Sequence, residues 1–311
     1  MDKLRFDGKV AVITGAGRGL GFSYARYLAR QGASVVVNDL GGAIAGGGAD
    51  ASVAAQAAAA IAQEGGHAVA SQADISTEDG AAAVVNTAVS EFGRVDIVIN
   101  NAGITAGKPF LDVTADDLRR HLDVHVTGTF LVTKAAWPHL IERGSGRVLN
   151  TISGAIFGTA PALPYTTAKG AVLGMTRSLA ASGIEHGIKV NGISPSATTR
   201  MIGLRENRAG VDWPDDVPSI NRDANAIAPV AAYLVHDHCE VTGEFFFADA
   251  GRVAHLVLGE TRGHVLEELS ASGVHDTWDR ILDIRGFVMP TSTVEHRQLA
   301  DEVLTAALES R

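Results

Sequence analysis

The chain has 311 residues, 46% of them hydrophobic, which is enough apolar material for a large buried core. Its 26 basic and 35 acidic side chains give a net charge of −9, so neither nucleic acid nor an anionic membrane is an expected partner. The single cysteine excludes an internal disulfide, and the polar N-terminus lacks an apolar run of membrane length, so the cytoplasm is the expected location.

Short apolar runs rich in β-branched residues alternate with longer segments of helical pattern. The runs predict seven buried strands, at Val10–Ile13, Ser34–Asn38, His67–Ala70, Val95–Asn100, Arg147–Ile152, Lys189–Ile193 and Glu244–Ala248. Expected helices between them include Ala49–Ala62, Leu118–Glu142 and Ala168–Ser182. This alternation, with connections long enough for right-handed crossovers, predicts an α/β fold built on a doubly wound parallel sheet.

Two stretches depart from the alternation. Residues 200–229 are polar, contain three prolines and show no period, and we interpret them as a lid over a site at the carboxyl ends of the strands. Residues 252–311 are expected to form a C-terminal extension, with helices at His264–Ser270 and Val294–Glu309 around a bend at Gly286–Pro290. Its many apolar side chains predict that the extension packs on the catalytic domain, residues 1–251.

A glycine-rich turn follows the first strand and opens the next helical segment. Its sequence is Thr14-Gly15-Ala16-Gly17-Arg18-Gly19-Leu20-Gly21, which differs in spacing from the common fingerprint G-x-G-x-x-G but has the same place between strand and helix. Glycines there let the backbone approach a pyrophosphate, and free N–H groups at the helix end stabilise its charge. The turn therefore predicts a dinucleotide site, and a glycine turn without a ligand is the plain alternative.

Asp39 ends the second strand, where a carboxylate can accept hydrogen bonds from both hydroxyls of an adenosine ribose and repel a 2′-phosphate. This favours NAD over NADP as the cofactor. Two alternatives stay open: Asp39 could only cap a turn, and Arg18 beside the glycines could attract a 2′-phosphate.

Tyr165 and Lys169 are four residues apart at the start of a helix, so their side chains share one face. A lysine there can lower the pKa of the phenol toward the working range, which makes Tyr165 a candidate acid or base. Ser153 ends the fifth strand and could donate a hydrogen bond to a substrate oxygen. A Tyr–Lys pair alone is more often an ordinary helix surface.

Taken together, Thr14–Gly21, Asn100-Asn101-Ala102-Gly103, Ser153 and Tyr165-x-x-x-Lys169 resemble the short-chain dehydrogenase/reductase family over about residues 6–251. The resemblance implies a Rossmann-like seven-stranded domain, homodimers or homotetramers, and hydride transfer between NAD and a small-molecule substrate. It implies Tyr165 as acid/base, Lys169 as its pKa partner and ribose ligand, and Ser153 as substrate orienter. It also implies cofactor contacts by Gly15, Arg18, Gly19, Leu20, Gly21, Asp39, Asp74, Ile75, Asn101, Ala102, Gly103, Pro195 and Thr198.

A finer resemblance is carried by residues 35–42, 124–130 and Ala135-Ala136-Trp137. These segments look like the (3R)-hydroxyacyl-CoA dehydrogenase domain of peroxisomal multifunctional enzymes and bacterial relatives, which implies a 3-hydroxyacyl-CoA substrate with an acyl chain that can be bulky or steroid-derived. The alternatives are a hydroxysteroid or other secondary-alcohol dehydrogenase and a non-catalytic NAD-binding regulator. The lid contains four arginines, Arg200, Arg205, Arg208 and Arg222. They could bind the phosphates of CoA, or they could form ion pairs with acidic residues of the lid.

Two departures from the family pattern concern the catalytic residues. His125 stands where most members have an asparagine that holds a relay water, and we expect it to have a part in the site. Ser153 and Tyr165 are one residue closer than usual, which we assign to a deletion in the loop between them. The pair His121 and His125 and the cluster at 236–240 have ligand-like spacing, but we predict no metal.

Overall fold

The computed structural model describes residues 4–199, 222–266 and 269–309. The chain divides into two compact units, residues 1–255 and residues 256–311, where the sequence suggested a boundary after residue 251. Most of the predicted lid, residues 200–221, lies outside the described residues. In the part of the chain that the structure describes, no helix has the length and apolar character needed to cross a membrane.

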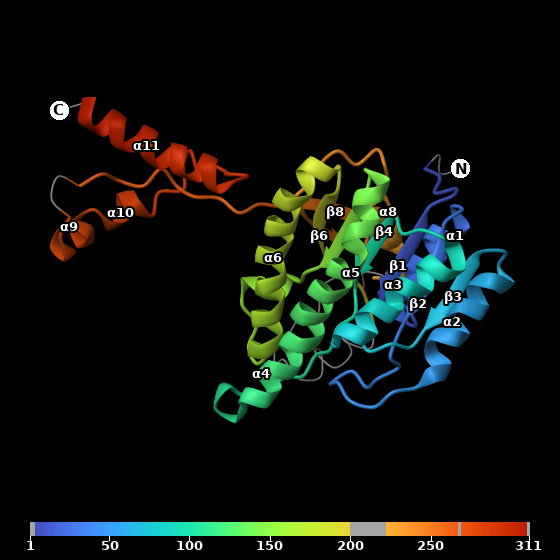
Figure 1. The fold of residues 1–311 in the computed structure, drawn as a ribbon. Helices are drawn as coiled ribbons and strands as arrows, with labels where there is room; N and C mark the ends of the chain where they lie inside the picture. The colour runs from blue at the N-terminus through green and yellow to red at the C-terminus, as the bar shows by residue number, and fades with distance from the viewer. Residues whose placement is uncertain (1–3, 200–221, 267–268, 310–311) are drawn as a thin grey trace. The chain divides into compact units, whose positions relative to one another are not determined.

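The first unit is built on one sheet of eight strands in the order β3-β2-β1-β4-β5-β6-β7-β8 (Figure 1). The strands are β1 Val10–Thr14, β2 Ser34–Asn38, β3 His67–Ser71, β4 Ile97–Asn100, β5 Arg147–Thr151, β6 Lys189–Ser196, β7 Phe245–Asp249 and β8 Arg252–Leu256. Val12 of β1 pairs in parallel with Val36 of β2 on one side and Val98 of β4 on the other. The chain reverses its direction of winding at this point, where α/β sheets bind their ligands.

Strand β8 is one more than the seven strands predicted. It follows β7 after only Ala250 and Gly251, which have φ angles of +44° and +91°. So short a link joins antiparallel neighbours, because a parallel pair needs a long crossover. Strands such as β1 and β4 were predictable because they are apolar and buried along their whole length. Every residue of β8, in contrast, is exposed or half-buried.

Helices cover both faces of the sheet (Figure 1). One buried cluster holds side chains of α1, α2 and α8, and a second holds side chains of α3, α5 and α6. The bounds are α1 Gly19–Arg30, α2 Ala51–Gln63, α3 Glu78–Phe92, α4 Ala115–Leu122, α5 Gly128–Arg143, α6 Leu163–Gly183 and α8 Ala228–Leu234. Short 3₁₀ turns lie at η1 Phe110–Asp112, η3 Gly154–Phe157, η4 Ile184–His186 and η5 Ala224–Ala226. The predicted doubly wound parallel architecture is confirmed.

The segment expected as one helix over Leu118–Glu142 is divided. Helix α4 ends at Leu122, a π-helical turn η2 covers Asp123–Thr127, and α5 begins at Gly128. A π turn widens the ring of one hydrogen bond without changing which residues are apolar, so the sequence pattern does not reveal it.

The second unit contains α9 Ala271–Asp276, α10 Trp278–Ile281 and α11 Thr293–Glu309. Helix α11 agrees with the expected Val294–Glu309. The expected helix His264–Ser270 is wrong, because its described residues are not helical and Ser270 instead caps α9 by accepting the Gly273 N–H at 3.1 Å. Packing of this extension on the first unit stays a prediction.

Candidate active site

Hydrogen bonds join the glycine turn between β1 and α1 to the residues that follow β4. Thr14 Oγ1 accepts hydrogen bonds from the N–H groups of Asn101 and Ala102, both at 3.1 Å, and Asn101 Nδ2 donates to the carbonyls of Thr14 and Gly15. Gly15 has a φ of +62°, and a Cβ there would lie 2.7 Å from the Ala102 Cα. The turn therefore needs glycine at this position.

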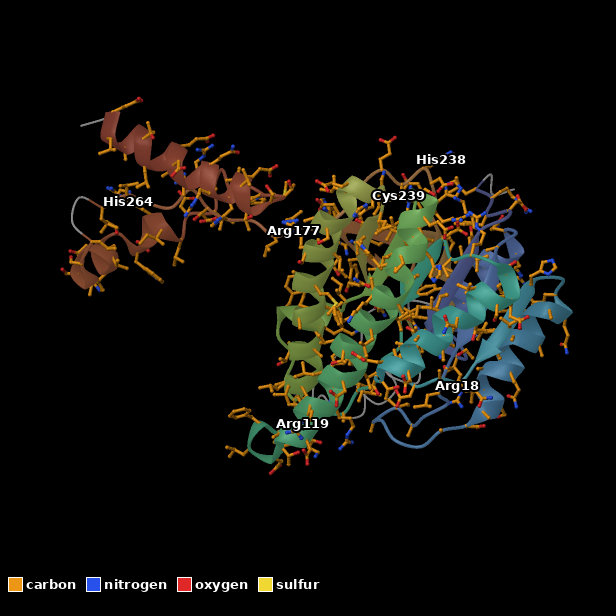
Figure 2. The ribbon with its side chains drawn as sticks, viewed as in Figure 1. Arg18, Arg119, Arg177, His238, Cys239 and His264 are labelled. Atoms are coloured by element: carbon orange, nitrogen blue, oxygen red, sulfur yellow. The ribbon has the colours of Figure 1, made fainter. Side chains whose placement is uncertain are left out.

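The second half of the turn begins α1. Arg18 precedes the helix with an extended backbone, and its side chain is half-buried (Figure 2). Gly19 has a φ of +55°, and a Cβ on Gly21 would lie 2.2 Å from the Gly15 carbonyl oxygen. The helix end thus sits directly against the turn, and its first N–H groups, which have no partner within a helix, can bind an anion.

The Asp39 carboxylate is held by two backbone N–H groups. Gly17 donates to Oδ2 at 2.9 Å and Gly41 donates to Oδ1 at 2.7 Å. Each carboxylate oxygen has a second lone pair, so the group can still accept hydrogen bonds from a ribose diol. Asp39 therefore faces the glycine turn at the carboxyl ends of β1 and β2.

The remaining predicted cofactor contacts lie at the ends of β3 and β6. The Asp74 carboxylate turns toward Ser76, whose N–H donates to it at 2.9 Å, and Ile75 is buried. Pro195 lines the pocket described below, and the Thr198 N–H donates to the carbonyl of a lid residue at 2.7 Å.

That lid residue is Arg222, the one of the four lid arginines within the described residues. Its Nε lies 2.9 Å from Asp249 Oδ1, at the end of β7, so its ion pair is with the sheet and not with an acid of the lid. Arg200, Arg205 and Arg208 lie outside the described residues.

Ser153, Tyr165 and Lys169 meet where β5 ends and α6 begins. Their exposed fractions are 8%, 8% and 3%. Ser153 Oγ accepts the Ala155 N–H at 3.2 Å, which leaves the hydroxyl proton available for a substrate oxygen. Lys169 Nζ donates to the Thr151 carbonyl at 2.5 Å and lies 5.8 Å from the centre of the Tyr165 ring. The structure thus brings together the three residues that the sequence singled out.

Burial lowers the pKa of Lys169 to about 7. The amine therefore changes its protonation state near neutral pH. A protonated amine beside a phenol favours the phenolate form of that phenol.

His125 forms the wall behind Tyr165. It lies in the π-helical turn η2, and its ring meets the Tyr165 ring edge-on with centroids 5.4 Å apart. Its Nε2 lies 2.8 Å from the Ile104 carbonyl oxygen, and a Cβ on Gly103 would come within 2.5 Å of its Cε1. Burial, helped by the charge of Lys169, lowers the pKa of His125 well below its usual value, so the ring is neutral.

The histidine pair that could have bound a metal is engaged by the backbone. The ring of His121 is stacked with that of His125, and its Nδ1 lies 2.8 Å from the Asp117 carbonyl oxygen. Among the described residues, no group of three or more His, Cys, Asp or Glu side chains could hold a metal ion.

A pocket of about 640 Å³ opens between the glycine turn and the catalytic side chains. Predicted residues that line it are Leu20, Asn101, Gly103, His125, Ser153, Tyr165, Lys169 and Pro195. It is also lined by residues that sequence reasoning missed, at Thr105, Thr151, Ile152, Ala197 and Thr199. Thr151 is the last residue of β5 and the others follow the ends of β4, β5 and β6, which is the signal that could have found them.

A glycine turn at the switch point of a parallel sheet, next to Ser, Tyr and Lys in one pocket, defines a dehydrogenase of the short-chain type. The family model described as short chain dehydrogenase matches residues 9–208, and the chain belongs to this family. Among the relatives, the peroxisomal multifunctional enzyme type 2 of Mus musculus is 35% identical over 97% of this chain and 40% of its own length. A short-chain type dehydrogenase/reductase of Mycobacterium tuberculosis is 37% identical over 89% of this chain and 95% of its own length.

Solved structures of dehydrogenases are also similar to this chain. The full-length peroxisomal multifunctional enzyme type 2 of Drosophila melanogaster matches 97% of this chain and 50% of its own, with a TM-score of 0.78 and 29% identity. A 7α-hydroxysteroid dehydrogenase complexed with NADH and 7-oxo glycochenodeoxycholic acid matches 79% of this chain and 95% of its own, with a TM-score of 0.67 and 32% identity. The chain thus spans 40% and 50% of the two multifunctional enzymes named here and 95% of the Mycobacterium tuberculosis protein and of the hydroxysteroid dehydrogenase.

Proposed function

We propose that the protein is an NAD-dependent dehydrogenase that interconverts a secondary alcohol and its ketone, with a 3-hydroxyacyl-CoA as the first candidate substrate. The observation that carries the proposal is the meeting of Ser153, Tyr165 and Lys169 in one pocket beside the glycine turn. When bound, NAD supplies the hydride acceptor for alcohol oxidation and NADH supplies the donor for ketone reduction.

The residues around the turn fit such a dinucleotide. The start of α1 can bind the pyrophosphate, and the Asp39 carboxylate, fixed by Gly17 and Gly41, is ready to accept a ribose diol. The predicted roles of Arg18, Gly19, Leu20, Asp74, Ile75, Ala102 and Thr198 as cofactor contacts belong to this proposal.

In the oxidation direction, Ser153 donates a hydrogen bond to the alcohol oxygen and Tyr165 takes the hydroxyl proton as the carbon gives up its hydride. Lys169 holds the charge that keeps the phenolate accessible, and the neutral ring of His125 fixes the position of Tyr165 from behind. Ketone reduction runs the same steps in reverse, with Tyr165 as the acid. Acid/base catalysis of this kind contributes about 10²–10⁴-fold to the rate.

The resemblance of residues 35–42, 124–130 and 135–137 to the (3R)-hydroxyacyl-CoA dehydrogenase domain of peroxisomal multifunctional enzymes supports the substrate. Peroxisomal multifunctional enzymes and hydratase-dehydrogenase-epimerases of several organisms are 35–37% identical to this chain. A hydroxysteroid is the second candidate, favoured by the likeness to the structure that contains an oxidised bile acid conjugate. We also propose a homodimer or homotetramer in the cytoplasm, although the relatives with multifunctional names are peroxisomal.

The test follows NADH absorbance while the protein is mixed with NAD and either (3R)- or (3S)-3-hydroxyacyl-CoA, a hydroxysteroid, or simple secondary alcohols. Turnover of the (3R) thioester, lost by at least 10²-fold in Tyr165→Phe while NADH still binds, is the expected result. Turnover of the steroid alone would move the assignment to the second candidate. Tight NADH binding without turnover of any substrate would favour a regulator.

A further inference from the structure

A glycine-rich loop between β2 and α2, residues 39–50, reaches the catalytic pocket. The two ends of the loop are joined, because the Asp50 N–H donates to the Leu40 carbonyl at 2.9 Å. Its middle is joined to another segment, because the Ile44 carbonyl accepts the N–H of Thr105 at 2.8 Å. Thr105 is one of the residues that line the pocket. The loop therefore extends from the end of β2 to the rim of the pocket.

The side chain of Arg120, in α4, lies against this loop. A Cβ on Gly46 would lie 3.1 Å from Arg120 Cδ and 3.2 Å from Ile104 Cδ1. Gly46 has a φ of +85°, a conformation that favours glycine, and the missing side chain leaves room for the arginine. Ile104 directly precedes the pocket residue Thr105. The stem of Arg120 is thus held beside the rim of the pocket.

Arg120 is exposed and, within the part of the chain that the structure describes, makes no ion pair. The acidic side chains of the same helix are already engaged. Asp116 pairs with Arg119, which is labelled in Figure 2, and Asp117 pairs with Lys108 at 2.7 Å. A guanidinium without a carboxylate partner is well suited to bind phosphate, and it counteracts the repulsion of anions by a chain of net charge −9.

We propose that Arg120 binds the phosphates in the CoA part of the substrate. In an acyl-CoA the pantetheine arm separates the thioester from the phosphates, so the cation that binds them has to lie outside the catalytic pocket. Arg120 meets this requirement at the rim, whereas Arg222 of the lid is engaged by Asp249. The inference rests on the proposed function and adds to it a residue that distinguishes CoA thioesters from other thioesters.

The test compares a (3R)-3-hydroxyacyl-CoA with the pantetheine thioester of the same acyl group, which lacks the nucleotide. In Arg120→Gln we expect the ratio of kcat/KM for the CoA thioester to that for the pantetheine thioester to fall about fivefold at low salt. The fall should arise from the KM of the CoA thioester and should shrink as salt screens the charges. Arg119→Gln removes the neighbouring arginine, which is paired with Asp116, and is the matched control that should leave the ratio unchanged.

Arg120→Lys keeps the charge without the planar fork of the guanidinium, so it should recover part of the lost ratio. An unchanged ratio in Arg120→Gln, or an equal fall in Arg119→Gln, would overturn the proposal. A parallel loss of kcat/KM with both thioesters would also overturn it, because Arg120 would then act on the pocket or the cofactor and not on the phosphates. Failure of the wild-type protein to turn over either thioester would instead overturn the proposed substrate, and this inference with it.

Discussion

At the residue scale, the protonation of Lys169 links the active site to stability. Burial holds its pKa near 7 in the folded chain, whereas an unfolded lysine keeps its proton up to about pH 10.4. Between these values the unfolded state binds more protons, so this group makes stability rise with pH.

We therefore expect the free energy of unfolding, measured relative to a Lys169→Met variant, to increase from pH 7 to pH 9 by at most about 1.4 kcal/mol per pH unit. Urea titrations of both proteins at several pH values provide the measurement. A difference that stays constant over this range would show that the amine keeps its proton in the fold, as it does in the unfolded chain.

At the element scale, replacing a glycine by alanine should have opposite effects on stability in α6 and α1. Gly174 lies inside α6 with no atom within 4 Å of a Cβ built on it, so Gly174→Ala should stabilise the protein by about 0.5–1 kcal/mol. Gly21 lies at the start of α1, where a Cβ would lie 2.2 Å from a backbone oxygen, so Gly21→Ala should lower both stability and NADH affinity. Thermal unfolding and NADH titration of the two variants compare them directly, and similar effects would contradict this account.

The elements that could be predicted from the sequence are those whose burial requires apolar residues. Strands such as Val10–Thr14 and Ile97–Asn100 are nearly continuous apolar runs, because both faces of a parallel sheet are covered. Ser153, Tyr165 and Lys169 were found through strand ends and helical spacing. The π-helical turn η2 and the close packing of Gly41 against the Asp50 backbone depend on contacts between segments, and neither leaves a pattern in the sequence.

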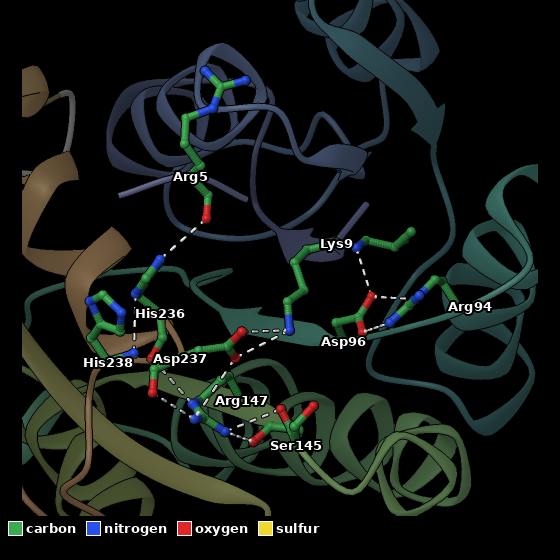
Figure 3. A network of polar contacts seen from close by, with 11 residues as sticks. Arg5, Lys9, Arg94, Asp96, Ser145, Arg147, His236, Asp237 and His238 are labelled. Carbon is green, nitrogen blue, oxygen red and sulfur yellow. Dashed lines mark hydrogen bonds and ion pairs between the residues drawn. The ribbon is translucent and has the colours of Figure 1, made fainter. Parts of the chain in front are cut away.

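At the scale of the whole molecule, a network of charged and polar groups lies at the amino-terminal ends of the strands, away from the pocket (Figure 3). Arg147, only 6% exposed at the start of β5, donates to the carbonyls of Ser145, Gly146, His236 and Asp237. Lys9 Nζ lies 2.8 Å from Asp237, and at the start of β4 the Asp96 carboxylate accepts the Val10 N–H at 2.9 Å. The network joins four segments that are distant in sequence.

Arg147→Met should therefore destabilise the fold by about 3 kcal/mol, because it leaves buried carbonyls without donors. NADH affinity should be nearly unchanged, since the cofactor residues lie at the carboxyl ends of the strands. Chemical denaturation and NADH titration measure the two effects, with Arg143→Met at the half-exposed end of α5 as the control. Loss of NADH affinity in a folded Arg147→Met protein would show that the network at the starts of the strands does affect the proposed cofactor site.

The hydrogen bonds that Gly17 and Gly41 donate to the Asp39 carboxylate have a practical consequence for protein engineering. Exchanging Asp39 for a small neutral residue, the obvious first step toward an enzyme that uses NADP, would deprive two backbone amides of their acceptor and loosen the glycine turn and the loop after β2 together. Asp39→Asn keeps one acceptor oxygen for one of the two amides, so it should disturb that scaffold less. The residue chosen to replace Asp39 should therefore decide whether the redesigned protein remains folded.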